Sequence, residues 1–222
     1  MGVIPENSKK NLKEQLEKKM KDDVEILFFE KTEDINEAIQ TYGSLTKTFL
    51  EELSDLSPKI KIKNIGMGDE LIKKYNIETS PTVMIGENKG YKIVYNGAPL
   101  GNEASSFINT IVFVSQNKSG FSEENLKLIN GIENEGLIQV FETLSCPYCS
   151  QSVLLANRIA IASKGKITVE NIDSEENLSL AQEFNVSSVP QQVINKDKNS
   201  ITIGVQKEED FIKQILEYTS SK

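Results

Sequence analysis

Cys146 and Cys149 are the residues of this chain whose type and spacing most directly suggest chemistry. They stand in the segment Ser-Cys-Pro-Tyr-Cys-Ser, residues 145–150, and they are the only cysteines among 222 residues. Two thiols three positions apart can form a structural disulfide, supply half of a metal site, stay idle in a core, or act as a redox pair. The rest of the sequence has to distinguish these four alternatives.

Metal binding and a structural disulfide are the weaker alternatives. A closed zinc site needs about four ligands, and the chain has no histidine and no third cysteine to complete such a set. A disulfide between positions i and i+3 closes a very short loop, so its entropic stabilisation of the fold is small. Structural disulfides are also rare in the cytosol. We therefore expect no metal and no other cofactor.

The composition indicates a globular chain that binds neither nucleic acid nor a membrane. Hydrophobic residues make up 38% and charged residues 26%, and the formal net charge of −8 argues against a nucleic-acid partner. No apolar run reaches membrane-spanning length, since the longest candidate, residues 107–114, contains Asn109 and Thr110. The first residues are polar and lead into a helical pattern, unlike a secretory signal. A cytoplasmic protein is expected.

The elements that must position the cysteines occur twice along the sequence. Ser8-Lys-Lys-Asn-Leu-Lys13 is repeated as Ser122-Glu-Glu-Asn-Leu-Lys127, and each copy opens a predicted helix. Both copies continue with a strand (24–30 and 137–142), a long helix (37–53 and 149–163), an alternating strand (59–65 and 166–172) and a short helix. Pro81 and Pro190 then precede two further strands and a closing helix. The repeat predicts the order α-β-α-β-α-β-β-α in each half.

This order predicts an α/β fold of two tandem units, each a mixed β-sheet flanked by helices. Strand–helix–strand segments favour parallel pairing with right-handed crossovers, and the last two strands favour an antiparallel hairpin. The turn residues of 117–120 place the boundary between units 1–117 and 118–222. Apolar surface on two stacked sheets would support a homodimer.

A unit of this order, with CxxC after its first strand and a proline before its third, resembles the thioredoxin fold. Two units in tandem with Cys146-Pro-Tyr-Cys149 in the second resemble the glutaredoxin-like protein disulfide oxidoreductases of archaea and thermophilic bacteria, over essentially the whole chain. The resemblance implies an enzyme that reduces, forms or isomerises disulfides in proteins. Its expected partners are proteins with disulfides or thiols, and a thioredoxin reductase or a peroxiredoxin.

The predicted position of the two cysteines explains how they would react. Cys146 lies where a strand meets a helix that starts near Pro147, a residue suited to the first helical position. The positive end of the helix dipole favours a thiolate over a thiol. We expect Cys146 to attack a substrate disulfide and Cys149 to resolve the mixed disulfide.

The resemblance also implies residues that bind the substrate. The peptide bond before Pro190 would be cis and would face the cysteines, which leaves the backbone of Val189 free to pair with a substrate strand. Tyr148 and Val189, with Leu144, would line an apolar patch suited to extended polypeptide. The predicted substrate-binding residues are Pro147, Tyr148, Val189 and Pro190.

Glu170 is the third predicted catalytic residue. It interrupts the strand Ile167-Thr-Val-Glu-Asn-Ile172, whose neighbours should be buried on both faces. Resembling proteins place an ionisable side chain near the resolving cysteine at this point. If Glu170 were buried and unpaired, its pKa would rise and it could carry a proton for Cys149. A strand-edge glutamate that faces water is the alternative.

The first unit has carboxylates where the second has thiols. Asp34-Ile-Asn-Glu37 aligns with Cys146-Pro-Tyr-Cys149, and an Asp followed three residues later by Glu at a helix start is a helix-capping pattern. We therefore predict that this unit is redox-inactive.

Three other functions compete with a protein disulfide oxidoreductase. The chain also resembles the N-terminal domain of the flavin-dependent reductase that feeds bacterial peroxiredoxins, which would make it an electron-relay module with one dominant partner. A glutathione-dependent glutaredoxin would carry a paired-glycine turn after Pro190, and residues 191–210 contain only Gly204. A binding scaffold without activity leaves the CPYC segment unexplained.

Overall fold

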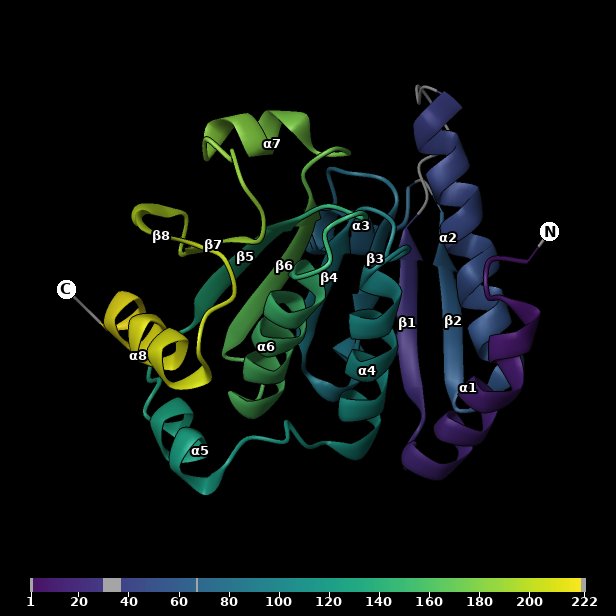
Figure 1. Cartoon of the computed structure of the whole chain (residues 1–222), viewed down its shortest axis with the longest axis horizontal. Helices are drawn as coiled ribbons and strands as arrows, with labels where there is room; N and C mark the ends of the chain where they lie inside the picture. Colours follow the sequence, from purple (N-terminus) through teal and green to yellow (C-terminus); the bar gives the residue numbers. More distant parts are fainter. Residues whose placement is uncertain (1, 30–36, 67, 221–222) are drawn as a thin grey trace.

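Both halves of the chain fold into the predicted order of elements (Figure 1). The computed structural model describes residues 2–29, 37–66 and 68–220. The first half contains α1 (Glu6–Lys19), β1 (Val24–Phe29), α2 (Glu37–Leu56), β2 (Ile60–Ile65), α3 (Glu70–Lys74), β3 (Thr82–Ile85), the short 3₁₀ helix η1 (Glu87–Lys89), β4 (Lys92–Asn96) and α4 (Glu103–Gln116). The second half contains α5 (Glu123–Asn130), β5 (Gly136–Glu142), α6 (Cys149–Ala162), β6 (Ile167–Asp173), α7 (Leu178–Glu183), β7 (Gln191–Ile194), β8 (Asp197–Ile203) and α8 (Glu208–Thr219).

The eight strands form one continuous mixed sheet in the order β2-β1-β3-β4-β6-β5-β7-β8. Within each half, the two strands joined by a helix pair in parallel and the last two strands pair antiparallel, as predicted. The halves meet where β4 pairs in parallel with β6. The expectation of two stacked sheets is therefore wrong, because the two sheets join edge to edge. The homodimer that rested on stacked sheets loses its structural basis.

Helices cover both faces of the sheet unequally. Alternate strand residues such as Ile26, Ile138 and Val169 pack in one large core with α1, α2, α4, α5, α6 and α8. The strand residues between these point to the other face of the sheet, where they contact α3 in the first half and α7 in the second. Figure 1 shows α4 and α6 side by side in front of the sheet, with α7 above it. Because successive side chains of a strand point to opposite faces of the sheet, the position of a residue in this alternation decides which helices it contacts.

A buried polar network joins the two halves beneath α4 and α6. The amide nitrogen of Asn157 donates to Tyr95 Oη at 2.9 Å and to Thr110 Oγ1 at 3.0 Å. Asn171 Nδ2 donates to Asn157 Oδ1 at 3.0 Å. Tyr95 and Thr110 belong to the first half, whereas Asn157 and Asn171 belong to the second. Because buried polar groups are stable only with their partners, this network fixes how the halves pack.

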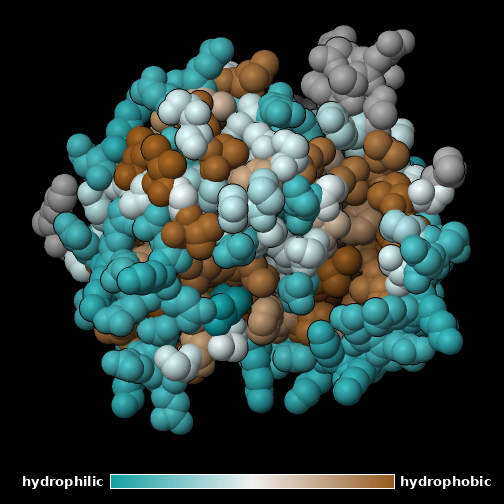
Figure 2. Space-filling view, viewed as in Figure 1, coloured by the Kyte–Doolittle hydropathy of each residue, from teal (hydrophilic) through white to brown (hydrophobic). Residues whose placement is uncertain are grey.

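The surface around α4 is apolar on one side. Figure 2 shows apolar side chains between α1 and α4, whereas hydrophilic side chains dominate the lower rim of this face. A hollow of about 430 Å³ lies here, lined among others by Leu12, Phe49 and Ile108. Within the described ranges, no helix combines the length and the apolar character that a membrane span requires.

Candidate active site

Cys146 and Cys149 form a disulfide at the start of α6, with their Cα atoms 5.5 Å apart. The helix begins at Cys149, two residues after the expected start at Pro147. The first helical N–H, that of Cys149, donates to Sγ of Cys146 at 3.1 Å. This is the contact that would stabilise a thiolate on Cys146 after reduction, because the N–H and the helix dipole both favour negative charge there.

The two sulfurs differ in access. Cys146 is 7% exposed and Cys149 is 0% exposed, so an incoming disulfide can approach the first cysteine and not the second. The neighbouring Pro147 and Tyr148 are exposed, and Tyr148 retains 63% of its accessible surface. The predicted order of attack, Cys146 first and Cys149 second, agrees with this difference in burial.

The peptide bond between Val189 and Pro190 is cis, as the resemblance implied. In the antiparallel pairing of β7 with β5, Gln191 lies opposite Phe141. Continuing this register by two residues places Val189 level with Thr143, at the start of the loop that carries Cys146. Val189 is half-buried, and its backbone N–H and C=O bond to no described residue. Both groups are therefore available to an added strand.

Glu170 does not have the environment that its predicted role requires. It is half-buried rather than buried, and it accepts a hydrogen bond from Gln139 Nε2 at 2.9 Å. Its register partners are Val94 and Gln139, and Val94 packs on the α3 side of the sheet. Cys149 opens α6 on the other face. The expectation of a buried and unpaired carboxylate at Glu170 is wrong, and we do not retain Glu170 as a catalytic residue.

A group of buried carboxylates lies on the α4 and α6 side of the sheet instead. Glu142 ends β5 and is paired in register with Asp173, which ends β6. Glu103 opens α4, and Glu176 follows β6. Burial, reinforced by the neighbouring carboxylates, raises the pKa of Glu142 well above its ordinary value and raises the pKa of Asp173. Burial raises the pKa of Glu103 and that of Glu176 to about 7.

Only some of the oxygen atoms of these carboxylates accept hydrogen bonds. Glu103 Oε2 accepts from Ser106 Oγ at 2.7 Å, and Glu176 Oε1 accepts from the N–H of Ala98 at 2.9 Å. Three buried carboxylate oxygens, Glu103 Oε1, Glu176 Oε2 and Glu142 Oε2, have no partner among the described residues. Among the same residues no cluster of acidic or sulfur side chains has the arrangement of a metal site. Burial thus raises the pKa of each carboxyl in this group, and Glu142 lies only four residues before Cys146 in the chain.

Sequence reasoning missed these carboxylates. In the sequence, Glu142 ends the strand 137–142 as Glu30 ends its counterpart 24–30, and a residue that is repeated in both halves indicates structure rather than chemistry. Its position four residues before Cys146, at the last residue of the strand, was the available signal. The Asp34 and Glu37 side chains lie outside the described part of the chain, so the capping interpretation of these two residues stays a prediction.

The pH dependence of stability tests the burial of Glu103. A carboxyl whose pKa is raised on folding binds more protons in the folded state, so its contribution to stability is present below about pH 4.5 and is lost as the pH rises through about 7. A rise from 4.5 to about 7 corresponds to about 3 kcal/mol. We expect Glu103→Gln to recover up to this amount at pH 8 and little at pH 4, measured by urea unfolding. Glu183→Gln, which changes an exposed carboxylate, is the control, and equal pH profiles for Glu103→Gln and the native chain would contradict the prediction.

The first half of the chain supports the loop of the cysteines directly. The N–H of Asn102 donates to the carbonyl oxygen of Leu144 at 3.1 Å. Gly101 adopts a φ of +56°, and a Cβ atom there would lie 2.7 Å from the same oxygen. A Cβ at Gly97 would lie 2.6 Å from Cβ of Asp173. Gly101 therefore fits against the active-site loop, and Gly97 against the end of β6, at distances that leave no room for a Cβ atom.

Comparison with known proteins shows what the second half of the chain is similar to. Residues 137–217 match the family described as thioredoxin domain. These residues include both cysteines, the cis-proline and strands β5 to β8. The second half therefore contains a thioredoxin-fold domain with its cysteine pair in the disulfide form.

Two solved structures match nearly the whole chain. One is the alkylhydroperoxide reductase protein AhpF from Enterococcus faecalis, with 25% identity and a TM-score of 0.82, over 96% of this chain and 99% of that one. The other is a protein disulfide oxidoreductase from Aeropyrum pernix, with 26% identity and a TM-score of 0.81, over 96% of this chain and 92% of that one. The tandem thioredoxin-like architecture of this chain is thus shared with both. Together with the disulfide, these matches support a thiol–disulfide oxidoreductase.

A curated relative is much longer than this chain. A protein of Ferdinandcohnia aciditolerans called NADH dehydrogenase is 25% identical over 171 residues, which make up 76% of this chain. The matched region spans 30% of that protein's length.

Proposed function

We propose that this chain is a thiol–disulfide oxidoreductase that reduces, forms or isomerises disulfides in proteins through Cys146 and Cys149. The observation that carries the proposal is the disulfide at the start of α6 between Cys146, which is 7% exposed, and Cys149, which is 0% exposed. In the reducing direction the Cys146 thiolate attacks one sulfur of a substrate disulfide, whose S–S bond breaks, and the departing thiolate takes up a proton. The Cys149 thiolate then attacks Sγ of Cys146, which releases the second substrate thiol and leaves the chain oxidised by two electrons.

The substrate would bind as an extended polypeptide beside the cysteine pair. Its backbone would pair with the free N–H and C=O of Val189, and Pro190, buried under this segment, would hold that backbone in place. Exposed Pro147 and Tyr148 would contact the substrate side chains next to the attacked sulfur. Backbone pairing of this kind favours many sequences, which suits a protein that acts on many disulfides.

The proposal assigns different roles to the two units. Residues 118–222 would form the redox unit, and residues 1–117 a redox-inactive unit that supports the active-site loop through segment 97–102. A cytoplasmic location belongs to the same proposal, and fractionation of the source cells tests it.

Trapping with Cys149→Ser tests the function. This variant can attack a disulfide but cannot resolve the product, so it should accumulate mixed disulfides through Cys146 when added to an extract of the source cells. Mass spectrometry of the adducts should identify many proteins. Cys146→Ser, which keeps the buried thiol, is the matched control and should give none. An equal yield of adducts from the two variants would contradict the assigned order of attack, and no adduct from either would contradict the function.

A second candidate is an electron-relay module that passes reducing equivalents to a peroxiredoxin. It is favoured by the match to the alkylhydroperoxide reductase protein AhpF and by the longer relative called NADH dehydrogenase. A thioredoxin reductase or an NADH-dependent reductase would then supply the electrons. The trapping experiment separates the two candidates, because a relay should give one dominant adduct and a general oxidoreductase many.

A further inference from the structure

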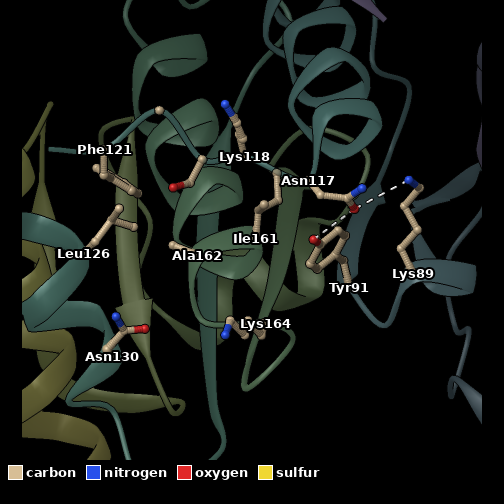
Figure 3. A pocket seen from close by; sticks show the side chains of 12 residues that line it. Lys89, Tyr91, Asn117, Lys118, Phe121, Leu126, Asn130, Ile161, Ala162 and Lys164 are labelled. Atoms are coloured by element: carbon tan, nitrogen blue, oxygen red, sulfur yellow. Dashed lines mark hydrogen bonds between the residues drawn. The ribbon is translucent and has the colours of Figure 1, made fainter. Parts of the chain in front are cut away.

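A hollow of about 750 Å³ lies at the opposite end of α6 from the cysteine pair (Figure 3). Helix α6 has 14 residues, so the two sites lie about 20 Å apart along it. The hollow is surrounded by the segment between α4 and α5, by α5, by the last turn of α6 and by the residues that lead from η1 into β4. Its volume is in the range of sites that bind small molecules.

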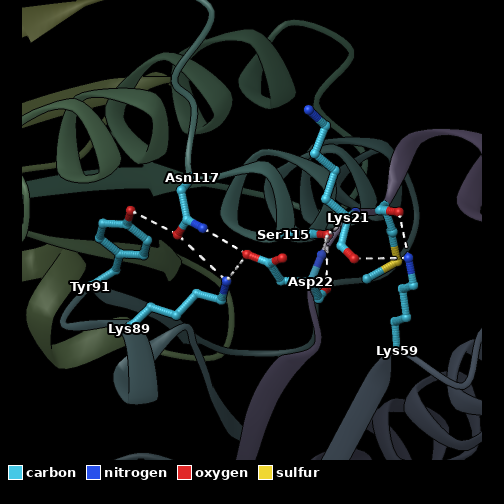
Figure 4. Close-up of polar contacts among 8 residues, drawn as sticks. Lys21, Asp22, Lys59, Lys89, Tyr91, Ser115 and Asn117 are labelled. Carbon is cyan, nitrogen blue, oxygen red and sulfur yellow. Dashed lines mark hydrogen bonds and ion pairs between the residues drawn. The ribbon is translucent and has the colours of Figure 1, made fainter.

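The charge around this hollow is opposite to that of the chain. Lys89, Lys118 and Lys164 line it, in a protein whose formal net charge is −8. Lys89 is neutralised by Asp22 at 2.9 Å and lies close to Asn117, as Figure 4 shows. Lys118 and Lys164 are exposed, and their ammonium groups have no ion-pair or hydrogen-bond partner among the described residues. Two uncompensated positive charges at one concave site attract anions.

Polar groups that lack partners lie in the same wall. Ser119 is 6% exposed, and its hydroxyl bonds to no described residue although the residue lines the hollow. The backbone N–H groups of Ser119, Gly120 and Phe121 likewise donate to no described residue. A hydroxyl and three N–H donors next to two lysines can together hold an anionic group.

Arg158 fixes the segment that carries these donors. Arg158 Nε donates to the carbonyl oxygen of Ser119 at 2.6 Å, and the guanidinium also bonds to Glu208. The same guanidinium lies 4.1 Å from the centre of the Phe121 ring. A segment that is fixed before a ligand arrives loses little entropy on binding.

The floor of the hollow is apolar. Phe121, Leu126, Ile161 and Ala162 contribute to it, next to the lysines at the rim. Figure 3 shows Ile161 and Ala162 between Lys164 on one side and Lys118 on the other. Covering this apolar floor with a ring or a short hydrocarbon chain removes apolar surface from water, which favours binding.

We propose that this hollow binds a small amphipathic anion, a carboxylate or a phosphate monoester joined to an apolar ring or short chain. The anionic group lies between Lys118, Lys164 and the donors of segment 119–121, and the apolar part covers Ile161 and its neighbours. The proposal uses no residue of the redox site and is independent of the redox function.

Titration of the full nitrogen-15-labelled chain with simple probes tests the proposal. Phenyl phosphate and benzoate should shift the backbone amide signals of residues 118–121 and 161–164 in a saturable way. Neutral benzyl alcohol and inorganic phosphate should each bind at least about tenfold more weakly than phenyl phosphate, because each lacks one half of the recognised chemistry. The stronger of phenyl phosphate and benzoate tells which anionic group the site prefers.

Two double variants provide the matched comparison. Lys118→Gln with Lys164→Gln should weaken phenyl phosphate binding by about tenfold or more. Lys10→Gln with Lys13→Gln removes the same charge from exposed positions of α1 and should leave binding unchanged. The proposal is overturned if the two double variants bind alike, if the shifts map to the hollow between α1 and α4, or if inorganic phosphate or benzyl alcohol binds as tightly as phenyl phosphate.

Discussion

Replacing Cys146 by serine will reduce the rate of thiol–disulfide exchange by at least about a thousandfold, because the attacking sulfur is lost. The measurement is the reduction of insulin disulfides by the chain in the presence of dithiothreitol, corrected for the rate of dithiothreitol alone. The structure gives the reason for so large an effect. Cys149 is fully buried beneath Cys146, so the remaining thiol cannot take over the attack on a protein substrate.

Two further variants make this result specific. Ser145→Ala changes the exposed neighbour of Cys146 and should keep nearly the full rate. Cys149→Ser should also lose turnover, and once reduced and freed of dithiothreitol it should accumulate a mixed disulfide with insulin after one attack. A Cys146→Ser variant that still reduces insulin at the native rate would show that the disulfide at the start of α6 is structural.

Replacing Gly101 by alanine will destabilise the fold and displace the active-site loop. The added Cβ would lie 2.7 Å from the carbonyl oxygen of Leu144. The residue also has a φ of +56°, a left-handed conformation that is unfavourable for alanine. Left-handed backbone costs about 1 kcal/mol for a non-glycine residue, and a contact with backbone that cannot move aside adds about 1–3 kcal/mol. We expect a total loss of about 2–4 kcal/mol in the free energy of unfolding, measured with urea.

Gly90→Ala separates backbone strain from the close contact. Gly90 has a φ of +83°, and a Cβ there would meet nothing within 4 Å. It should therefore cost only about 1 kcal/mol. Gly101→Ala should in addition change the pKa of the Cys146 thiol, followed by thiolate absorbance at 240 nm in the reduced chain, whereas Gly90→Ala should not. Equal losses of stability in the two variants would mean that segment 97–102 yields to the added methyl group.

The order of elements could be predicted because periodicity and repetition agree. Alternation in residues 166–172 and the longer apolar period after Cys149 each indicate an element type, and the second copy of the pattern checks the first. The cysteine pair was predictable for a similar reason, since two thiols three residues apart at a strand–helix junction have few uses. These signals are local in sequence.

The environment of the site could not be predicted because it depends on contacts that are distant in sequence. Whether Glu170 or Glu142 faces α6 is decided by strand parity and by which helices cover each face. A shift of one residue in the register of a strand would move each of its side chains to the other face of the sheet. Likewise, nothing in the strand pattern of β4 or β6 shows that these two edges pair with each other. Segment 97–102 reaches the loop of Cys146 only because of that pairing.

Without residues 1–117, strand β6 would become the border of a four-stranded sheet. The ladder that now pairs residues 168–172 with β4 would face water. The amide of Asn157 would lose Tyr95 and Thr110, and the amide of Asn171 would lose the carbonyl oxygen of Val94. An unprotected border of this kind recruits other strands and leads to aggregation. We therefore expect the chain to need residues 1–117 to remain free of aggregates, although this half contains no cysteine.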